Sequence, residues 1–173
     1  HNTIEAYFPI AVAILDAGLV CSASLPSPAE MGASIHINGT GSSIIDTVFV
    51  CRKTGFISKK SLPFSAAGVA GLVCQDLAEL RKGNVKPSIG DTRCIAYGHL
   101  IRLAIWNLRS TWDNSTNTLK KLSAVADWLR AFGGWPEVER HLNELNGTCS
   151  HEPLLTVREN TMDYGVEYAH VSF

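Results

Sequence analysis

The segment 44–52 (Ile-Ile-Asp-Thr-Val-Phe-Val-Cys-Arg) constrains the fold more than any other part of the sequence. Its β-branched and aromatic residues predict a β-strand. The apolar side chains of this strand fall on both faces: Ile45, Thr47, Phe49 and Cys51 on one, and Ile44, Val48 and Val50 on the other. A strand that is apolar on both faces indicates an interior position with a layer of structure on each side. The sequence therefore predicts an α/β fold.

A helix and another strand are expected before this segment. Residues 2–17 carry apolar side chains at helical spacing, and Asn2 and Glu5 form a capping-box pattern. Pro9 predicts either a bend or a regular helix that begins near it. Residues 19–25 predict a strand, and the prolines, glycines and serines of residues 26–43 predict a long loop.

Helical patterns dominate the second part of the chain. They predict helices over 65–82, from Asp91 to about residue 109, over 118–132, and from Pro136 to Gly147. The helix capped by Asp91 is apolar over most of its girth, so we expect it to be buried. Residues 154–173 contain two weak strand-like runs. The expected organisation is an α/β part at 1–60, a helical accessory region at 61–150 and a tail at 151–173.

The overall composition limits the choice of function. Apolar residues make up 46% of the chain, charged residues 18%, and the net charge is −1. Binding to DNA must therefore rest on a local patch. No apolar run is long enough to span a bilayer, so we expect no membrane partner. Five scattered cysteines predict a reducing, cytoplasmic location without a disulfide framework, and the one close Cys/His pair, Cys149 and His151, predicts no metal site.

Three local features are candidates for binding. Glu30 stands in a Pro-flanked loop after the first strand, where open α/β sheets build their sites, although a solvated loop glutamate looks the same. The loop that contains Ser34, His36, Ser42 and Ser43 has the glycines and hydroxyls that suit phosphate, or simply a flexible surface loop. The basic residues after the second strand either neutralise phosphates or are a solvated strand end; they are Arg52, Lys53, Lys59 and Lys60.

Several short motifs occur together in an order that resembles one family. They are His1-Asn2-Thr3, Asp16-Ala17-Gly18-Leu19, Pro26 to Met31, Gly41-Ser42-Ser43 and Val48 to Lys53, with a weaker echo from Gly90-Asp91 to Gly98-His99. The run resembles the end of the catalytic domain in prokaryotic adenine-specific DNA methylases, which use S-adenosylmethionine. Leu25 and Ala29 depart from the pattern, which often has Trp and Thr there. The resemblance covers the first third of the chain closely and the helical part loosely.

The resemblance implies a fold and a role. The two strands would be the last pair of a methyltransferase-type, Rossmann-like sheet, with the final strand inserted antiparallel beside its neighbour and the first helix packed on one face. The reaction would transfer a methyl group to an exocyclic amino group of a DNA base, with adenine N6 as the expected target. His1, Glu30, Ser34, His36, Ser42 and Ser43 would border the substrate cleft, and Arg52, Lys53, Lys59 and Lys60 would contact the DNA backbone.

The same resemblance implies that the chain holds no catalytic residues. The family needs a glycine-rich loop for S-adenosylmethionine and an Asp-Pro-Pro-Tyr motif that polarises the target amino group and stacks on a flipped base. Neither occurs in the sequence. The resemblance implies that both lie upstream of His1. The chain starts with His1 rather than Met and opens into a structured-looking segment, which fits a fragment, a trimmed protein or a processed chain. Alone, the chain is expected to be inactive, and the complete protein would bind the cofactor and DNA.

Two other hypotheses remain open. The chain could be a complete, non-catalytic binding or scaffold domain, since two strands covered by helices can be stable. It could also belong to a methyltransferase that acts on RNA or on a small molecule. An apolar sheet edge without a partner would favour a fragment, whereas blunted edges would favour a complete domain.

Overall fold

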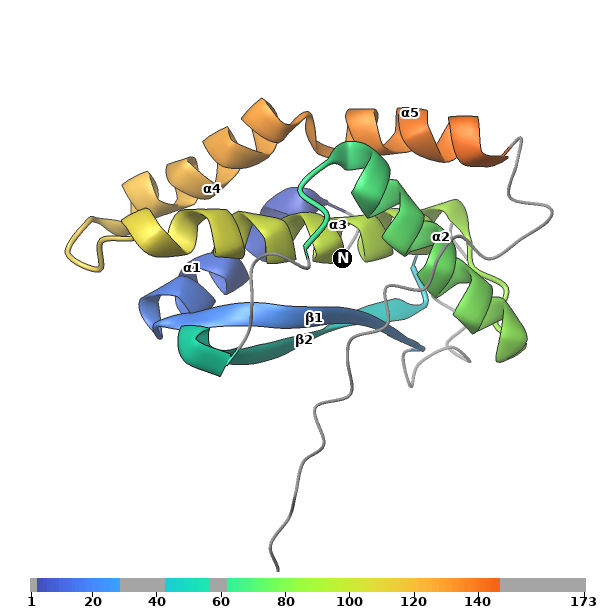
Figure 1. Cartoon of the computed structure of the whole chain (residues 1–173), viewed down its shortest axis with the longest axis horizontal. Coiled ribbons are helices and arrows are strands. Elements are labelled where there is room, and N and C mark those ends of the chain that lie inside the picture. The colour runs from blue at the N-terminus through green and yellow to red at the C-terminus, as the bar shows by residue number, and fades with distance from the viewer. Residues whose placement is uncertain (1–2, 29–42, 57–61, 147–173) are drawn as a thin grey trace, which may run out of the picture.

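The computed structural model describes residues 3–28, 43–56 and 62–146. These residues form a mixed α/β structure that is mostly helical (Figure 1). The sheet consists of β1 (Leu19–Pro28) and β2 (Ile45–Lys53). The helices are α1 (Phe8–Asp16), α2 (Ala66–Lys82), α3 (Ile89–Leu108), α4 (Thr118–Phe132) and α5 (Gly134–Asn146). Short 3-10 helices lie at Ile4–Tyr7, Thr54–Phe56 and Arg109–Thr111. The tail at 151–173 lies outside the described residues.

The first helix is divided near Pro9. A 3-10 turn precedes α1, and Pro9 lies in the first turn of α1, where its missing N–H costs nothing. The prediction that the regular helix begins near Pro9 is confirmed. Gly18 follows with φ +74°, a left-handed conformation that favours glycine and turns the chain into β1. The predicted cap, Asn2, lies outside the described residues.

The two strands pair antiparallel, as predicted. The register places Leu25 opposite Val48 and Pro28 opposite Ile45. An irregularity between Cys21 and Ala23 interrupts the ladder. There, the indole N–H of Trp106 donates to the Cys21 carbonyl oxygen at 2.7 Å, so a buried backbone group keeps a partner.

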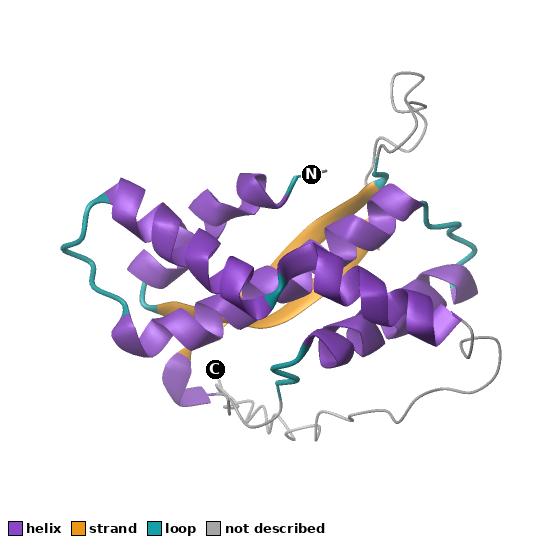
Figure 2. Ribbon diagram, turned by 90° about the horizontal axis from the view of Figure 1, so that it is seen from above, coloured by secondary structure: helices purple, strands orange, loops and turns teal. Residues whose placement is uncertain are grey.

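Helices cover one face of this sheet. Figure 1 shows α1 and α3 packed directly above the strands and α4 and α5 beyond α3. Figure 2, turned by 90°, shows the strands lying beneath the helices. On the opposite face, Leu25 and Val48 are 49% and 46% exposed. The described residues therefore supply one of the two predicted layers, and the second layer stays a prediction. The sequence pattern of β2 shows that both faces of the strand are apolar. It cannot show whether the layers that cover the two faces both belong to this chain.

Helix α3 is the central element of the structure. It contacts both strands and also α1, α2, α4 and α5, and almost every residue from Cys94 to Trp106 is buried. This confirms the burial expected from its apolar girth. Its start differs from the prediction: Ser88 is the N-cap, and Asp91 is the third residue of the helix, where it closes a capping box with Ser88. The sequence alone does not distinguish the two residues, because both Ser and Asp suit the N-cap position.

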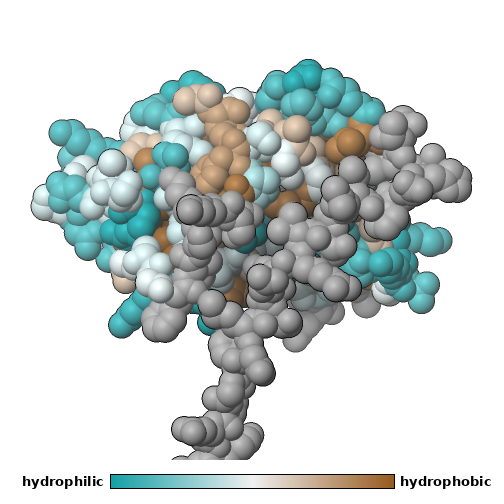
Figure 3. All heavy atoms as spheres, viewed as in Figure 1, coloured by the Kyte–Doolittle hydropathy of each residue, from teal (hydrophilic) through white to brown (hydrophobic). Residues whose placement is uncertain are grey.

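The other helices have boundaries close to the predicted ones. Ser65 caps α2, and Asn117 caps α4. Gly133 ends α4 with φ +98°, and α5 begins at once at Gly134, two residues before Pro136. In Figure 3, hydrophilic residues surround the outer ends of the helices and apolar residues lie between them. One core cluster contains buried residues from Tyr7 to Leu142, so described residues on both sides of the predicted boundary at residue 60 share it.

Candidate functional site

The site candidate that the structure places best is Ser43, at the start of β2. Its hydroxyl donates to Oδ1 of Asp91 at 2.8 Å, and the backbone N–H of Ile44 donates to the same oxygen at 2.8 Å. The other carboxylate oxygen accepts from the backbone N–H of Ser88 at 2.6 Å. Since Asp91 belongs to α3, these bonds fasten the chain that returns from segment 29–42 to the first turn of α3. We call this group the Asp91 anchor.

The Asp91 anchor is a charged group inside the core. Asp91 is fully buried. Burial opposes ionisation, but hydrogen bonds from the Ser88 backbone, the hydroxyls of Ser43 and Ser88, and the Ile44 backbone outweigh it, so the pKa of Asp91 lies below its ordinary value. A buried carboxylate that accepts this many hydrogen bonds stays ionised near neutral pH and holds the loop end in place. The anchor therefore positions the chain and leaves no free carboxylate oxygen for a substrate.

A second close contact joins α3 to the sheet at Gly98. A Cβ built on Gly98 would lie 2.3 Å from Oγ of Ser24 in β1 and 2.8 Å from Cγ2 of Thr47 in β2. Real Cβ atoms do not approach this closely, so the glycine permits α3 to lie against both strands. Asp91 and Gly98 both belong to the weaker echo in the helical part, and both serve the junction between α3 and the sheet.

A third junction involves Asp16, at the end of α1. Its Oδ1 accepts from Lys121 Nζ at 2.7 Å and from the Trp112 indole N–H at 2.8 Å. The hydrogen bond from Lys121 comes first among the causes that lower the pKa of Asp16, and that from Trp112 second. Lys121 belongs to α4 and is almost completely buried. The motif residue Asp16 therefore ties the first helix to the helical region.

An aromatic row runs from the sheet to α5. Successive rings meet edge to face: Phe49 and Tyr7 at 6.3 Å, Tyr7 and Tyr97 at 6.1 Å, and Tyr97 and Trp135 at 6.2 Å between centroids. Burial raises the pKa of Tyr7 to about 12. Burial also raises the pKa of Cys21 to about 12. Both groups stay protonated near neutral pH, so neither suits a nucleophile or a general base.

The predicted site residues do not come together at one place. Ser43 lies at one end of β2, whereas Arg52 and Lys53 are exposed at the other end, about 30 Å away at the usual rise of a strand. The loop end and these basic residues therefore serve different surfaces. The remaining candidates lie outside the described residues: His1, Glu30, Ser34, His36, Ser42, Lys59 and Lys60.

Sequence reasoning missed a histidine pair between two helices. Nε2 of His99 in α3 lies 2.8 Å from Oδ2 of Asp76 in α2, and the His99 side chain is 4% exposed. Nδ1 of the same ring is buried without a partner among the described residues. The two residues are far apart in the sequence, and His99 stands in an apolar helix, so no local pattern indicates the pair. It fixes α2 against α3.

A cluster of metal-ligand side chains and a membrane-spanning helix are both absent from residues 3–28, 43–56 and 62–146. These contain no cluster of three or more histidine, cysteine or acidic side chains that could hold a metal ion. No helix in this part combines the length and the apolar character needed to cross a bilayer. Cys149 and His151 lie outside the described residues.

Comparisons with known proteins add no relative to this picture. They found no matching family model, no similar curated protein and no similar solved structure. The resemblance to adenine-specific DNA methylases therefore stays a prediction.

Proposed function

We propose that this chain forms the C-terminal end of the catalytic domain of an S-adenosylmethionine-dependent DNA methyltransferase, with adenine N6 as the target. The observation that carries the proposal is the asymmetry of the β1–β2 pair. One strand is suited to a sheet edge, the other to a sheet interior, and one face is apolar but uncovered by described residues.

Strand β1 has the features of an edge strand. Pro26 and Pro28 lie within it and have no backbone N–H to offer to a further strand. The irregularity near Cys21 is a second device that is common at sheet edges. A larger sheet would therefore not continue beside β1.

Strand β2 has the opposite character. Its nine residues include no proline or glycine and are rich in β-branched and aromatic types. Among the described strands, it pairs only with β1, so its second edge is available. This matches the arrangement that the resemblance implies, in which the final strand is inserted antiparallel into the sheet beside the strand before it.

The uncovered face of the β1–β2 pair also has the apolar side chains expected of a sheet with a layer of helices on each side. Leu25 and Val48 are directly opposite each other and lie about half exposed, with Ala23 and Val50 as the next pair on this face. Sheets in α/β proteins of this type have helices on both faces. The missing layer and the neighbouring strand would come from the upstream part of the catalytic domain.

The Asp91 anchor supports the predicted position of the cleft. Pro28 and Ile45 pair where β1 ends and β2 begins, so both ends of segment 29–42 lie at the carboxyl end of β1. Ligands of open α/β sheets bind beyond the carboxyl ends of the strands. We therefore keep Glu30, Ser34, His36, Ser42 and Ser43 among the residues proposed to border the cleft, separate from Arg52 and Lys53, which are proposed to contact the DNA backbone.

A methylation assay on the complete reading frame tests the proposal. The coding DNA upstream of the His1 codon is expected to encode a glycine-rich loop and an Asp-Pro-Pro-Tyr-like motif. The protein expressed from the whole frame should transfer labelled methyl groups from S-adenosylmethionine to unmethylated DNA and yield N6-methyladenine, detected by mass spectrometry. The 173-residue chain alone should transfer none. A frame without both motifs, or a product that methylates RNA or small molecules instead of DNA, would contradict the proposal.

One observation favours a second candidate, a binding domain complete in itself. The described residues form a single core with many fully buried side chains, and they keep the polar groups of Asp91 and His99 inside it. The two candidates differ in solution behaviour. A part of a larger sheet should self-associate as its concentration rises, because its apolar face and edge are open. A complete binding domain should remain a monomer in sedimentation experiments over the same range.

A further inference from the structure

Two cysteines lie opposite each other on the β1–β2 pair. Cys21, near the start of β1, is the register partner of Cys51, near the end of β2. Directly opposite residues of an antiparallel pair have Cα atoms about 4.5–5.5 Å apart and side chains on the same face. A disulfide usually spans a Cα separation of about 4.4–6.8 Å. The backbone therefore places the two cysteines at a separation that a disulfide can bridge.

The two thiols also interact with each other, and they differ in access. Burial, followed by the negative charge of the neighbouring Cys51, raises the pKa of Cys21 to about 12. Burial also raises the pKa of Cys51, but a hydrogen bond with the Cys21 thiol opposes that rise. Cys51 is partly exposed, whereas Cys21 is fully buried. Cys51 is therefore the thiol that a dissolved oxidant meets first and that ionises more easily.

Neighbouring groups fix Cys21 in this position. The indole N–H of Trp106 donates to its carbonyl oxygen at 2.7 Å, and its thiol donates to the Ala23 carbonyl oxygen at 3.0 Å. Although burial is the main influence on the pKa of Cys21, the positive charge of Arg102 in α3 opposes it. A cation beside a thiol pair stabilises the thiolate, which is the form that attacks a disulfide.

We propose that Cys21 and Cys51 are a modification site, which small-molecule disulfides such as glutathione disulfide convert into a cross-strand disulfide. The Cys51 thiolate attacks one sulfur of glutathione disulfide and forms a mixed disulfide. The glutathione thiolate that leaves takes up the proton that Cys51 lost. The sulfur of Cys21 then attacks Sγ of Cys51, and its proton passes to the second departing glutathione. In total, two protein thiols are oxidised and one glutathione disulfide is reduced to two glutathione molecules.

The second step is the slower one near neutral pH, because Cys21 keeps its proton there. The direct contact of the two thiols compensates in part, since an attack within one molecule has a high effective concentration. A disulfide that forms only on oxidation agrees with the reducing location that the cysteine pattern predicts, where disulfides are mostly transient. The inference goes beyond the proposed methyltransferase function and does not depend on it.

Oxidation of the folded 173-residue chain tests the proposal. The chain is incubated with glutathione disulfide at pH 7 and at pH 9, quenched with acid, alkylated, and mapped by mass spectrometry without reduction. We expect a peptide pair joined through Cys21 and Cys51, which forms at least roughly tenfold faster at pH 9 and is lost on treatment with dithiothreitol. A Cys51 that stays a free thiol, remains joined to glutathione or pairs with another cysteine would overturn the inference.

Variants at three cysteines separate the pair from ordinary thiol reactivity. In Cys21→Ala, Cys51 should still react but should stop at the mixed disulfide with glutathione. In Cys51→Ser, Cys21 should remain a free thiol because it is buried. Glutathione on Cys21 in the Cys51→Ser variant would contradict the order of the two steps.

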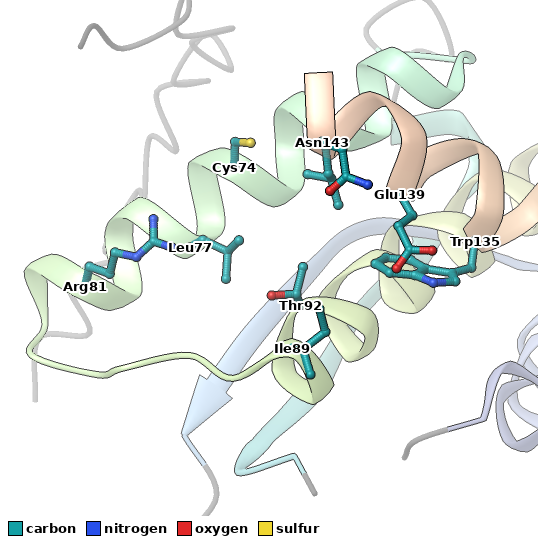
Figure 4. A pocket seen from close by; sticks show the side chains of 9 residues that line it. Cys74, Leu77, Arg81, Ile89, Thr92, Trp135, Glu139 and Asn143 are labelled. Atoms are coloured by element: carbon teal, nitrogen blue, oxygen red, sulfur yellow. The ribbon is translucent and has the colours of Figure 1, made fainter. Parts of the chain in front are cut away.

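The matched control is Cys74→Ser. Cys74 is also partly exposed, but it belongs to α2 and lines a cavity between α2, α3 and α5 (Figure 4). This variant should form the disulfide between Cys21 and Cys51 at the wild-type rate. Loss of that disulfide in Cys74→Ser would show that the two strand cysteines do not react as a pair.

Thermal unfolding shows whether the bridge fits the native sheet. A disulfide between Cys21 and Cys51 would close a loop of about 30 residues, which constrains the unfolded chain. The oxidised chain should therefore unfold at a temperature roughly 5–15 °C higher than the reduced chain. An unchanged or lower unfolding temperature would contradict the claim that the native register brings the two thiols together.

Discussion

The two faces of the β1–β2 pair are made from similar residues but have different surroundings. On the helix-covered face, Ile45 is 2% exposed and Gly98 of α3 approaches Ser24 and Thr47 closely. On the uncovered face, Leu25 and Val48 lie about half exposed with no described element above them. A sheet with one face covered by helices and the other face apolar and exposed is typical of a structure that packs against a further layer of protein. This difference is the main support for the proposal that the chain completes a larger sheet.

The largest contrast should come from placing a threonine on each face of the sheet. Ile45→Thr removes apolar contacts in the core and buries a hydroxyl, so we expect it to lower the free energy of unfolding by about 2–4 kcal/mol. Val48→Thr keeps the β-branched shape at an exposed position and should change it by less than about 0.5 kcal/mol. Urea denaturation of both variants measures the difference. Similar losses would show that the second face is also covered in the chain alone.

The Asp91 anchor should give the next largest effect. Asp91→Asn places an amide group among donors and should cost about 2–3 kcal/mol. The pKa of Asp91 is lowered by folding, so its contribution is present above its unfolded value, about 3.9, and is lost as pH falls through the folded value. Denaturation at a series of pH values should therefore show a smaller acid-induced loss in the variant than in the wild type. A parallel loss in both proteins would mean that Asp91 does not carry this dependence.

The contact at Gly98 should be sensitive to a single methyl group. Gly98→Ala forces α3 away from Ser24 and Thr47 and should cost about 1–3 kcal/mol. Gly71→Ala is the matched control, because Gly71 also lies inside a helix and a Cβ there meets nothing within 4 Å. That variant should be neutral or more stable by about 0.5–1 kcal/mol. Thermal unfolding of the pair gives the comparison, and equal effects would refute the close approach.

A charge on the uncovered face should have the smallest effect on the free energy of unfolding and the largest effect on self-association of the chain. Leu25→Asp places a charge on the uncovered face and should hardly change unfolding of the isolated chain. It should abolish the concentration-dependent association expected of an open apolar face. Analytical ultracentrifugation of the wild type and the variant measures this association. Ser22→Asp is not a suitable control, because the Ser22 hydroxyl donates to the Val50 carbonyl oxygen. A wild-type chain that stays monomeric would remove the basis of the prediction.

Local chemistry explains what could be predicted from the sequence. Helix periods and the role of Pro9 depend on neighbouring residues, so they could be predicted from the sequence directly. The alternation in β2 also identified both apolar faces. It could not show that the described helices all lie on one face, because an apolar side chain looks the same whether its cover is in this chain or elsewhere.

The contacts of the candidate site could not be predicted from the sequence, because they join residues that are far apart along the chain. Asp91 and Ser43 are separated by 48 residues, and His99 and Asp76 by 23. Side chains that meet across such separations have no common local pattern. Four of the motif residues that the structure describes join elements to one another: Asp16, Ser43, Asp91 and Gly98. Their positions explain why these residue types are needed without assigning them any chemistry.

Hydrogen exchange along β2 is the most direct test of the central claim, that β1 and β2 complete a sheet supplied by the upstream part. The amides of β2 that do not pair with β1 should exchange rapidly in the 173-residue chain. In the product of the complete reading frame, the same amides should become protected, and Leu25 and Val48 should be shielded from surface labelling. Equal exchange of β2 in both proteins would contradict the account.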